Sequence, residues 1–258
     1  MAEPLTLSVD CGGLFLKSSV LDDAGTMHSK PNRIPTPYPL SPELFVETIA
    51  SIASELPAAY RATIGMPGMI RNGVVVAIPH YVNTKGPNTN LDPELLNAWN
   101  GFDVQSAIAA TLRIPTLVLN DAEVHGAGII TGTGYEVVIT LGTGLGFAIF
   151  YGGKLTPHFE LSHATIRRNT TIDKWIGEHE RKRLGTIFWS RRVRQLIDEL
   201  RPVFKWDRLY IGGGNARLIR AVDLARMGED VVIVPNSAGV AGGVRAWSLE
   251  HYHRKFES

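Results

Sequence analysis

The sequence predicts a two-lobed α/β protein. Short β-branched and apolar runs, typical of strands, alternate along its 258 residues with segments whose apolar residues recur at helical spacing. Two halves of the chain share the order strand, glycine-rich turn, strand, helix, which indicates related lobes of mixed sheets flanked by helices. We place the first lobe at residues 1–118 and the second at 119–237, with a C-terminal helix at about 238–258 that packs back on the first lobe.

The composition is that of an ordinary globular protein, with 44% hydrophobic and 20% charged residues. A formal net charge of +1 gives no global reason to expect nucleic acid or an anionic membrane as a partner. Cys11 is the only cysteine, which excludes an internal disulfide and a cysteine-rich zinc site and favours the reducing cytoplasm. No apolar h-region follows the opening MAEPLTLSVD, and no apolar run is long enough to span a bilayer, so we expect neither a secretion signal nor a membrane span.

The first glycine turn is DCGG, near the N-terminus. We expect strands at residues 5–9 and 14–21 on either side of it, with Lys17 near the start of the second, and a third strand at 27–34. The N–H groups at Gly12 and Gly13 can face a phosphate. On turn chemistry alone, a plain hairpin is the more frequent outcome.

The proline-rich PTPYPLSP follows as a connector to a helix at residues 42–56. Strands are expected at 61–66 and 74–78, a helix at 103–112 and a further strand at 114–119. The polar stretch at residues 79–91 is too long for a simple hairpin loop. His80 and Asn83 are therefore candidates to contact a polyhydroxylated ligand, although a surface loop without a ligand is the alternative.

Residues 117–150 combine a carboxylate at a strand end with a glycine-rich turn. Asn120 stands where a helix N-cap belongs, and Asp121 would lie in the first helical turn. The β-branched run VVIT then leads into LGTGLG, whose glycines let backbone N–H groups converge on an anion. A carboxylate near an anion cradle predicts phosphoryl transfer, because that reaction needs a base to orient a hydroxyl and donors to hold the phosphates.

Glu160 and His163 lie in the next segment, YGGKLTPHFELSH, which we interpret as a hairpin followed by a strand that ends in these residues. A carboxylate and an imidazole three residues apart can hydrogen-bond adjacent hydroxyls of a sugar. A metal site is a poorer interpretation, because no third ligand lies nearby with suitable spacing. The alternative to a sugar site is that Glu160 lies on the surface and that His163 forms its hydrogen bonds within the protein.

Basic residues are concentrated between 167 and 194, a segment that we call the basic run. It holds nine of them against three acidic residues, a local excess of +6. This asymmetry could mark a track for a polyanion, although a solvated helix face is the more common outcome. Helices are expected at 172–183 and 187–203 with a break at Gly185.

The last part of the chain contains a third glycine turn. A strand at residues 208–211 opens into GGGN, which a helix should follow, and another strand spans 231–234. The segment PNSAGVAGGVRAW then begins the final helix.

Three glycine turns, DCGG, LGTGLG and IGGGN, with an Asn-Asp pair before the second, resemble the ROK family of sugar kinases. The phrases IPTPYPLSPE, IGMPGMIRNGVV, LNDAE, TLGTGLGFAIFYGGKL and ELSH are most similar to its polyphosphate glucokinase branch, which also lacks the family's cysteine zinc cluster. The resemblance covers nearly the whole chain. It implies the actin-like (ribonuclease H-like) ATPase fold, with an active-site cleft between the lobes.

The resemblance also assigns roles to residues. Asp121 would take the proton from the attacking sugar hydroxyl, and Asp10 would hold Mg²⁺ through water. The sugar would be bound by Asn120, Glu160, His163, Asn83 and Gly68. The phosphates would be held by Asp10, Gly12, Gly13, Lys17, Gly142, Thr143, Gly144, Gly212, Gly213 and Gly214.

Three residues depart from the family pattern. Leu14 replaces the threonine of the first turn, and Ser162 replaces a glycine between Glu160 and His163. Thr165 stands where an acidic residue is usual in the polyphosphate glucokinase branch. The missing hydroxyl at position 14 should weaken phosphate binding by roughly 1 kcal/mol.

We therefore expect a cytoplasmic, homodimeric kinase that phosphorylates the 6-hydroxyl of glucose or a related hexose from ATP or polyphosphate with Mg²⁺ and without zinc. Its partners would be a sugar and a phosphoryl donor, with no nucleic acid and no membrane. The alternative is a non-catalytic sugar-binding or regulatory protein on the same fold, suggested by Leu14 and Thr165. A DNA-binding repressor is disfavoured, because no helix-turn-helix segment precedes the first strand.

Overall fold

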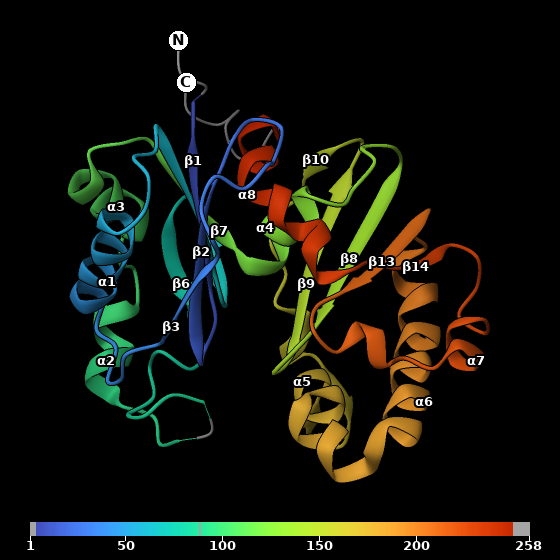
Figure 1. Ribbon diagram of the computed structural model, residues 1–258. Helices are drawn as coiled ribbons and strands as arrows, with labels where there is room; N and C mark the ends of the chain where they lie inside the picture. Colours follow the sequence, from blue (N-terminus) through green and yellow to red (C-terminus); the bar gives the residue numbers. More distant parts are fainter. Residues whose placement is uncertain (1–3, 88, 250–258) are drawn as a thin grey trace, which may run out of the picture. The chain divides into compact units, whose positions relative to one another are not determined.

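The computed structural model describes residues 4–87 and 89–249, which form two compact units (Figure 1). Among the described residues, the first unit comprises those up to Gly128 together with 240–248, and the second comprises 129–239 and 249. Each unit has its own hydrophobic core and its own five-stranded sheet. The predicted C-terminal helix extends beyond 249, and that part of it lies outside the described residues.

The sheet of the first unit has the order β3-β2-β1-β4-β7. Strands β1, β2 and β3 are antiparallel neighbours, whereas β1, β4 and β7 run parallel. Parallel strands end at the same edge of a sheet, so the carboxyl ends of β1, β4 and β7 meet there. The bounds are Thr6–Cys11 for β1, Phe15–Leu21 for β2, Asn32–Pro35 for β3, Arg61–Met66 for β4 and Thr116–Asn120 for β7.

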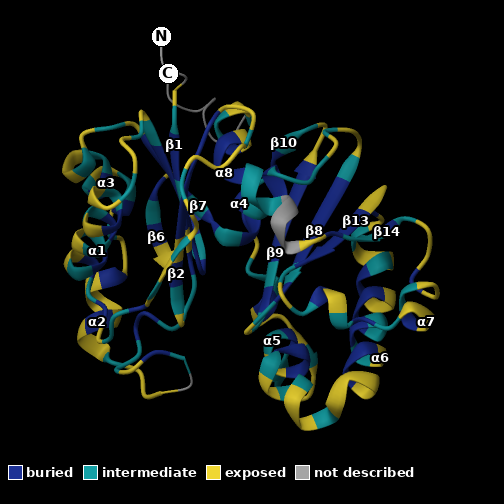
Figure 2. Ribbon diagram, in the orientation of Figure 1, coloured by how far each residue is buried: buried dark blue, intermediate teal, exposed yellow. Residues whose placement is uncertain are grey.

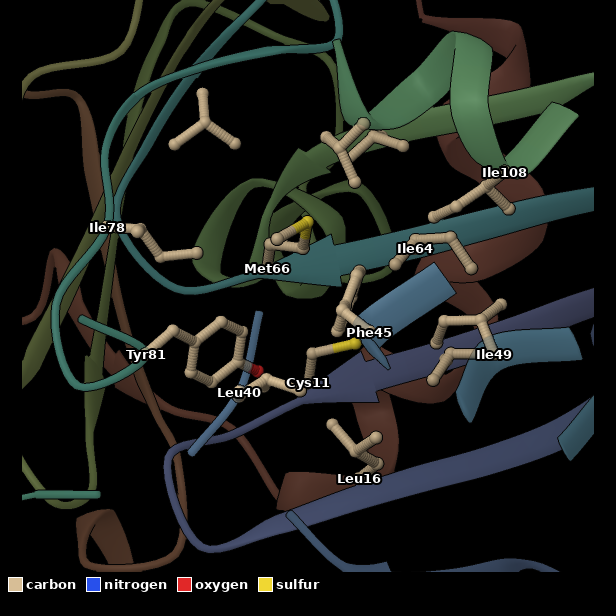
Figure 3. Packing of buried hydrophobic residues seen from close by; sticks show 14 of the residues in the cluster. Cys11, Leu16, Leu40, Phe45, Ile49, Ile64, Met66, Ile78, Tyr81 and Ile108 are labelled. Carbon is tan, nitrogen blue, oxygen red and sulfur yellow. The ribbon is translucent and has the colours of Figure 1, made fainter. Parts of the chain in front are cut away.

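Helices cover both faces of this sheet (Figure 1). One face carries α1 (Pro42–Ser54), α2 (Pro93–Trp99) and α3 (Val104–Leu112), and the other carries α4 (Asp121–Ala127) and α8 (Gly242–Arg245). Ser41 caps α1 by accepting a hydrogen bond from the N–H of Leu44 at 3.2 Å, as its position before Pro42 predicts. The core beneath α1 packs Phe45 and Ile49 against Leu16 and Ile64 (Figure 3). A small hairpin of β5 (Met69–Arg71) and β6 (Val74–Ala77) follows β4.

The sheet of the second unit repeats this topology, with the order β10-β9-β8-β13-β14. Strands β8, β9 and β10 are antiparallel neighbours, and β8, β13 and β14 are parallel. The repetition agrees with the order of elements that both halves of the sequence share. The bounds are Tyr135–Leu141 for β8, Leu145–Tyr151 for β9, Lys154–Leu155 for β10, Arg208–Gly212 for β13 and Val231–Ile233 for β14.

Helix α6 (Glu178–Phe204) provides most of the helical cover of the second sheet. Its buried side, which includes Trp189, Val193 and Ile197, belongs to the core, while its outer side is exposed (Figure 2). The helix is interrupted at Gly185, as predicted. The remaining elements in the described part of the chain are short: α5 (Ile172–Ile176), α7 (Ala221–Leu224), β11 (Thr165–Arg167), β12 (Thr170–Thr171) and 3₁₀ turns at Leu161–His163, Ala216–Leu218, Asn236–Ala241 and Ala246–Ser248.

Several expectations for single elements were wrong. The third strand begins at Asn32 rather than 27, because Pro31 lacks the N–H that a ladder needs. No strand reaches Glu160, which precedes a 3₁₀ turn. The predicted helix at 172–183 is divided at Gly177, whose ψ of 172° is extended.

Two further differences concern helices. The sequence analysis did not predict α2, although Asp92 before Pro93 is a standard signal for the start of a helix. The turn-forming residues just before Asp92 hid this signal. The third glycine turn leads into a 3₁₀ turn at Ala216–Leu218 instead of directly into an α-helix. Within the described residues, none of the helices combines the length and the apolar character needed to cross a membrane.

Candidate active site

The carboxyl edge of the first sheet carries the Asn-Asp pair. Asn120 ends β7 and caps α4, and Asp121 is the first residue of that helix, as predicted. The Asn120 Oδ1 atom accepts the N–H of Ala122 at 2.8 Å, and Glu123 Oε2 accepts the N–H of Asn120 at 3.0 Å. This capping box fixes the start of α4 and with it the position of the Asp121 carboxylate.

Asn120 also fixes the neighbouring turn. Its Nδ2 atom donates to the carbonyl oxygen of Gly68 at 2.8 Å, and only 3% of the residue is exposed. Gly68 has φ of +89°, in the left-handed region that only glycine adopts readily, and a Cβ there would contact the backbone of Ala77. Asn120 thus joins the ends of β4 and β7, and Asp121 beside it is half-buried.

Asp10 lies at the same edge, at the end of β1. It is opposite Lys17 in the β1–β2 ladder, and Lys17 Nζ lies 2.8 Å from Asp10 Oδ2. Both side chains are about half exposed, so their ion pair is solvated and weak enough for another charged group to compete with it. Asp10 and Lys17 therefore stand together beside the first glycine turn.

The polar stretch at 79–91 packs on that turn. A Cβ on Gly13 would lie 2.8 Å from Pro87 Cγ and 3.0 Å from His80 Cδ2. His80 has φ of 68°, a left-handed conformation that is strained for a residue with a side chain. Asn83 donates through Nδ2 to the Gly86 carbonyl at 3.3 Å, so its amide supports the loop itself, while its role as a sugar ligand stays a prediction.

His125 is a residue of this edge that sequence reading did not single out. It lies one helical turn after Asp121 on α4, a spacing that places both on one helix face. Burial lowers its pKa, partly offset by the negative charge of Asp10, and its Nε2 atom has no hydrogen-bond partner among the described residues. The i, i+4 spacing from Asp121 was the signal that could have found it.

In the second unit, the second and third glycine turns lie side by side because β8 and β13 are parallel neighbours. Asn215 joins them: its N–H donates to the Leu141 carbonyl at 3.0 Å, and its Nδ2 atom donates to the Gly142 carbonyl at 3.1 Å. The same Nδ2 atom also donates to Glu178 Oε2 at 2.9 Å. The structure thus brings together two turns that are about seventy residues apart in the chain.

Helix α6 begins at these turns. The N–H of Glu178 donates to the Thr143 carbonyl at 3.0 Å. Hydrogen bonds from Arg181 at 2.6 and 2.7 Å, with a further one from Asn215, lower the pKa of Glu178 to about 2 despite partial burial. Asp173 Oδ1 accepts the N–H of Leu145 at 2.9 Å, which fixes the start of β9.

Glu160 lies in a separate cluster of the second unit. Ser162 Oγ donates to Glu160 Oε1 at 2.6 Å, and His158 Nε2 lies 3.7 Å from Oε2. Burial raises the pKa of Glu160, but the groups of His158 and Ser162 together outweigh it, so the pKa is lowered overall. His163 is exposed.

Sequence reading missed His158 in this cluster, although its spacing from Glu160 in HFE was visible. The cluster holds an ionised carboxylate at neutral pH, which can accept hydrogen bonds from sugar hydroxyls.

Several residues of the basic run form ion pairs within α6. Arg181 pairs with Glu178, Arg183 and Arg192 pair with Glu180, and Arg194 pairs with Asp198. Glu178 and Glu180 are already counted in the excess of +6, so the run keeps a net positive charge, and both the polyanion track and the solvated helix face stay predictions.

Comparisons with known proteins identify the family and the fold. The family model described as the ROK family matches residues 6–171. Polyphosphate glucokinase of Mycobacterium tuberculosis is 26% identical over 261 residues, covering 95% of this chain and 92% of the relative.

Solved structures are similar over the whole fold. Inorganic polyphosphate/ATP-glucomannokinase from Arthrobacter sp. strain KM has a TM-score of 0.76 at 27% identity, covering 95% of this chain and 100% of the other. A ROK family glucokinase from Streptomyces griseus, in complex with glucose and AMPPNP, has a TM-score of 0.69 at 19% identity, covering 94% and 98%. These likenesses confirm the predicted actin-like fold.

Proposed function

The chain belongs to the ROK family, and we propose that it transfers a phosphoryl group from ATP or polyphosphate to the 6-hydroxyl of glucose or a related hexose. Relatives named polyphosphate glucokinase and glucokinase support a phosphotransferase of the hexokinase and glucokinase type. The similarity to a polyphosphate/ATP-glucomannokinase supports both donors.

In this proposal, Asp121 is the general base. A carboxylate in the first turn of a helix that begins at a strand end is held rigidly, and the capping box of Asn120 and Glu123 fixes it there. A base so placed orients the sugar hydroxyl and accepts its proton as the phosphoryl group is transferred. The observation that carries the proposal is that β1 and β7 run parallel on either side of β4, so that Asp10 and Asp121 stand at the same edge of the sheet.

The proposed sugar ligands of the first unit are Asn120, Gly68 and Asn83, and those of the second unit are Glu160 and His163. Glu160 is suited to accept hydrogen bonds from hydroxyls, since its pKa is lowered and the carboxylate is ionised at neutral pH. The phosphates would be held by the N–H groups of the three glycine turns and by Lys17.

Asp10 would hold Mg²⁺ through water. The described residues contain no group of three His, Cys, Asp or Glu that could hold a metal ion by themselves. An exposed carboxylate beside a phosphate turn nevertheless suits Mg²⁺, which keeps several waters and binds one or two carboxylates together with substrate phosphates. The bound ion would neutralise charge on the phosphates.

A coupled assay with a panel of hexoses and with both donors tests the proposal. Asp121→Asn should lower kcat by about 100-fold or more, because the amide cannot accept the proton. Asp103→Asn is the matched control: Asp103 caps α3 by accepting the N–H of Ser106 at 2.9 Å, and asparagine caps a helix equally well. Phosphorylation of no hexose by the wild-type protein would exclude this function, and a fully active Asp121→Asn variant would exclude Asp121 as the base.

A non-catalytic sugar-binding protein is the second candidate, favoured by Leu14, which is 57% exposed where the family has a threonine. Calorimetry separates the two. Binding of a hexose without binding of nucleotide or polyphosphate would support the second candidate.

A further inference from the structure

The carbonyl groups of the first glycine turn (residues 12–14) accept hydrogen bonds from residues outside it. Thr36 Oγ1 donates to the Gly12 carbonyl at 2.9 Å, and Tyr38 Oη donates to the Gly13 carbonyl at 2.8 Å. The N–H of Thr36 donates to the Leu14 carbonyl at 3.0 Å, and Tyr81 Oη lies 3.4 Å from the Gly12 carbonyl. Three successive carbonyls are therefore engaged; we call Thr36, Tyr38 and Tyr81 the hydroxyl clamp.

The clamp determines where the N–H groups of the turn point. A trans peptide is planar, so its N–H points opposite to its C=O. Because the carbonyls of Gly12 and Gly13 point towards the clamp, the N–H groups of Gly13 and Leu14 point away from it. Successive N–H groups facing one side form a concavity that binds anions.

Packing of their rings fixes the positions of the Tyr81 and Tyr38 hydroxyls. The Tyr81 ring is fully buried and packs against Phe45 and Trp99, with centroid distances of 5.8 and 5.7 Å. The Tyr38 ring lies against Gly86, where a Cβ would be 2.6 Å from Tyr38 Cε2. Burial raises the pKa of Tyr38 to about 12 and that of Tyr81 well above its ordinary value, so both remain hydrogen-bond donors at neutral pH.

This arrangement matters because Leu14 supplies no hydroxyl to the turn. Its side chain is 57% exposed, and only the backbone of residue 14 can serve a phosphate. Binding by the turn then depends on how well its N–H groups are aligned, which the clamp controls.

We propose that Thr36 and Tyr38 are positioning residues that aim the N–H groups of Gly13 and Leu14 at the phosphoryl donor. This inference rests on the proposed function. It concerns the donor alone, so the hexose should bind independently of the clamp.

Steady-state kinetics of Thr36→Val and Tyr38→Phe test the inference, with KM measured separately for donor and hexose. Each change removes one hydrogen bond to the turn, and we expect the donor KM to rise about fivefold while the hexose KM stays within twofold. Thr36→Ser keeps the hydroxyl and should restore the wild-type donor KM. Thr48→Val is the matched control, because Thr48 Oγ1 donates only to the Leu44 carbonyl within α1.

Equal rises in both KM values, or no rise in the donor KM, would overturn the inference. Calorimetry with a non-hydrolysable nucleotide and with polyphosphate makes the test independent of turnover. A wild-type protein that binds donor but has no kinase activity would exclude the proposed function. The donor affinities of Thr36→Val, Tyr38→Phe and the wild-type protein would then still test the clamp. A wild-type protein that binds neither donor would overturn both.

Discussion

The two sheets have the same strand order, yet their glycine turns are held by different chemistry. In the first unit, neutral hydroxyls from Thr36 and Tyr38 hold the carbonyls of residues 12 and 13. In the second unit, Asn215 joins the two turns to Glu178, whose carboxylate is paired with Arg181. Neutral support is insensitive to pH and salt, whereas ionic support depends on both.

The space around the turns differs as well. A Cβ on Gly13 would meet the side chains of Pro87 and His80. A Cβ on Gly213 would meet the backbone of Leu141, at 2.5 Å from its oxygen and 2.7 Å from its nitrogen. Side chains can shift more easily than a paired strand, so the same substitution should have unequal effects in the two units.

The largest expected effect is that of Gly213→Ala. Gly213 has φ of +84°, and the new methyl group would press on the Leu141 backbone. We expect the free energy of unfolding to fall by about 3 kcal/mol or more, measured by urea denaturation. Gly214→Ala is the control, because a Cβ there meets open space and φ is not positive. A Gly213→Ala variant as stable as Gly214→Ala would contradict this description of the turn.

Asn215→Ala should come next. It removes the hydrogen bonds to the Gly142 carbonyl and to Glu178 and leaves both acceptors short of a donor. We expect a loss of about 1–3 kcal/mol in the free energy of unfolding and a higher donor KM. Gln195→Ala provides a control, since its amide bonds only the exposed Glu199 on the surface of α6. An unchanged donor KM would show that the third glycine turn does not contribute to donor binding.

Gly13→Ala should have a smaller effect on stability, about 1 kcal/mol, because its φ is not positive and its neighbours are side chains. Urea denaturation of Gly13→Ala beside Gly213→Ala compares the two turns directly. Equal losses in the free energy of unfolding would show that the two turns tolerate a methyl group equally well, contrary to this comparison.

The smallest effect concerns pH. The pKa of Glu178 in the folded protein is about 2, below its ordinary value of 4.5, so its pairing stabilises the fold above pH 4.5 and is lost as pH falls towards 2. The contribution is small, because water screens a partly exposed pair.

Urea midpoints measured at pH 5 and pH 3 should therefore differ less for Glu178→Gln than for the wild-type protein. Thr36→Val should keep the full wild-type difference between the two pH values, because its hydroxyl does not titrate. An identical pH dependence in all three proteins would show that the ionic support in the second unit has no measurable effect.

Local features could be predicted from the sequence by itself. The N-caps at Ser41 and Asn120 and the break at Gly185 depend on neighbouring residues, so their sequence pattern was sufficient. The repeated order of strand, glycine turn and strand likewise predicted two related sheets, and the motifs identified the family.

Only the tertiary structure decided which side chains support the turns. Tyr81 reaches Gly12 across 69 residues, Asn120 reaches Gly68 across 52, and Asn215 reaches Gly142 across 73. Such contacts depend on strand order and register, which bring distant segments together and leave no periodic signal in the chain. The sequence therefore identified the candidate base Asp121 and the three glycine turns, while folding determined how each turn is held.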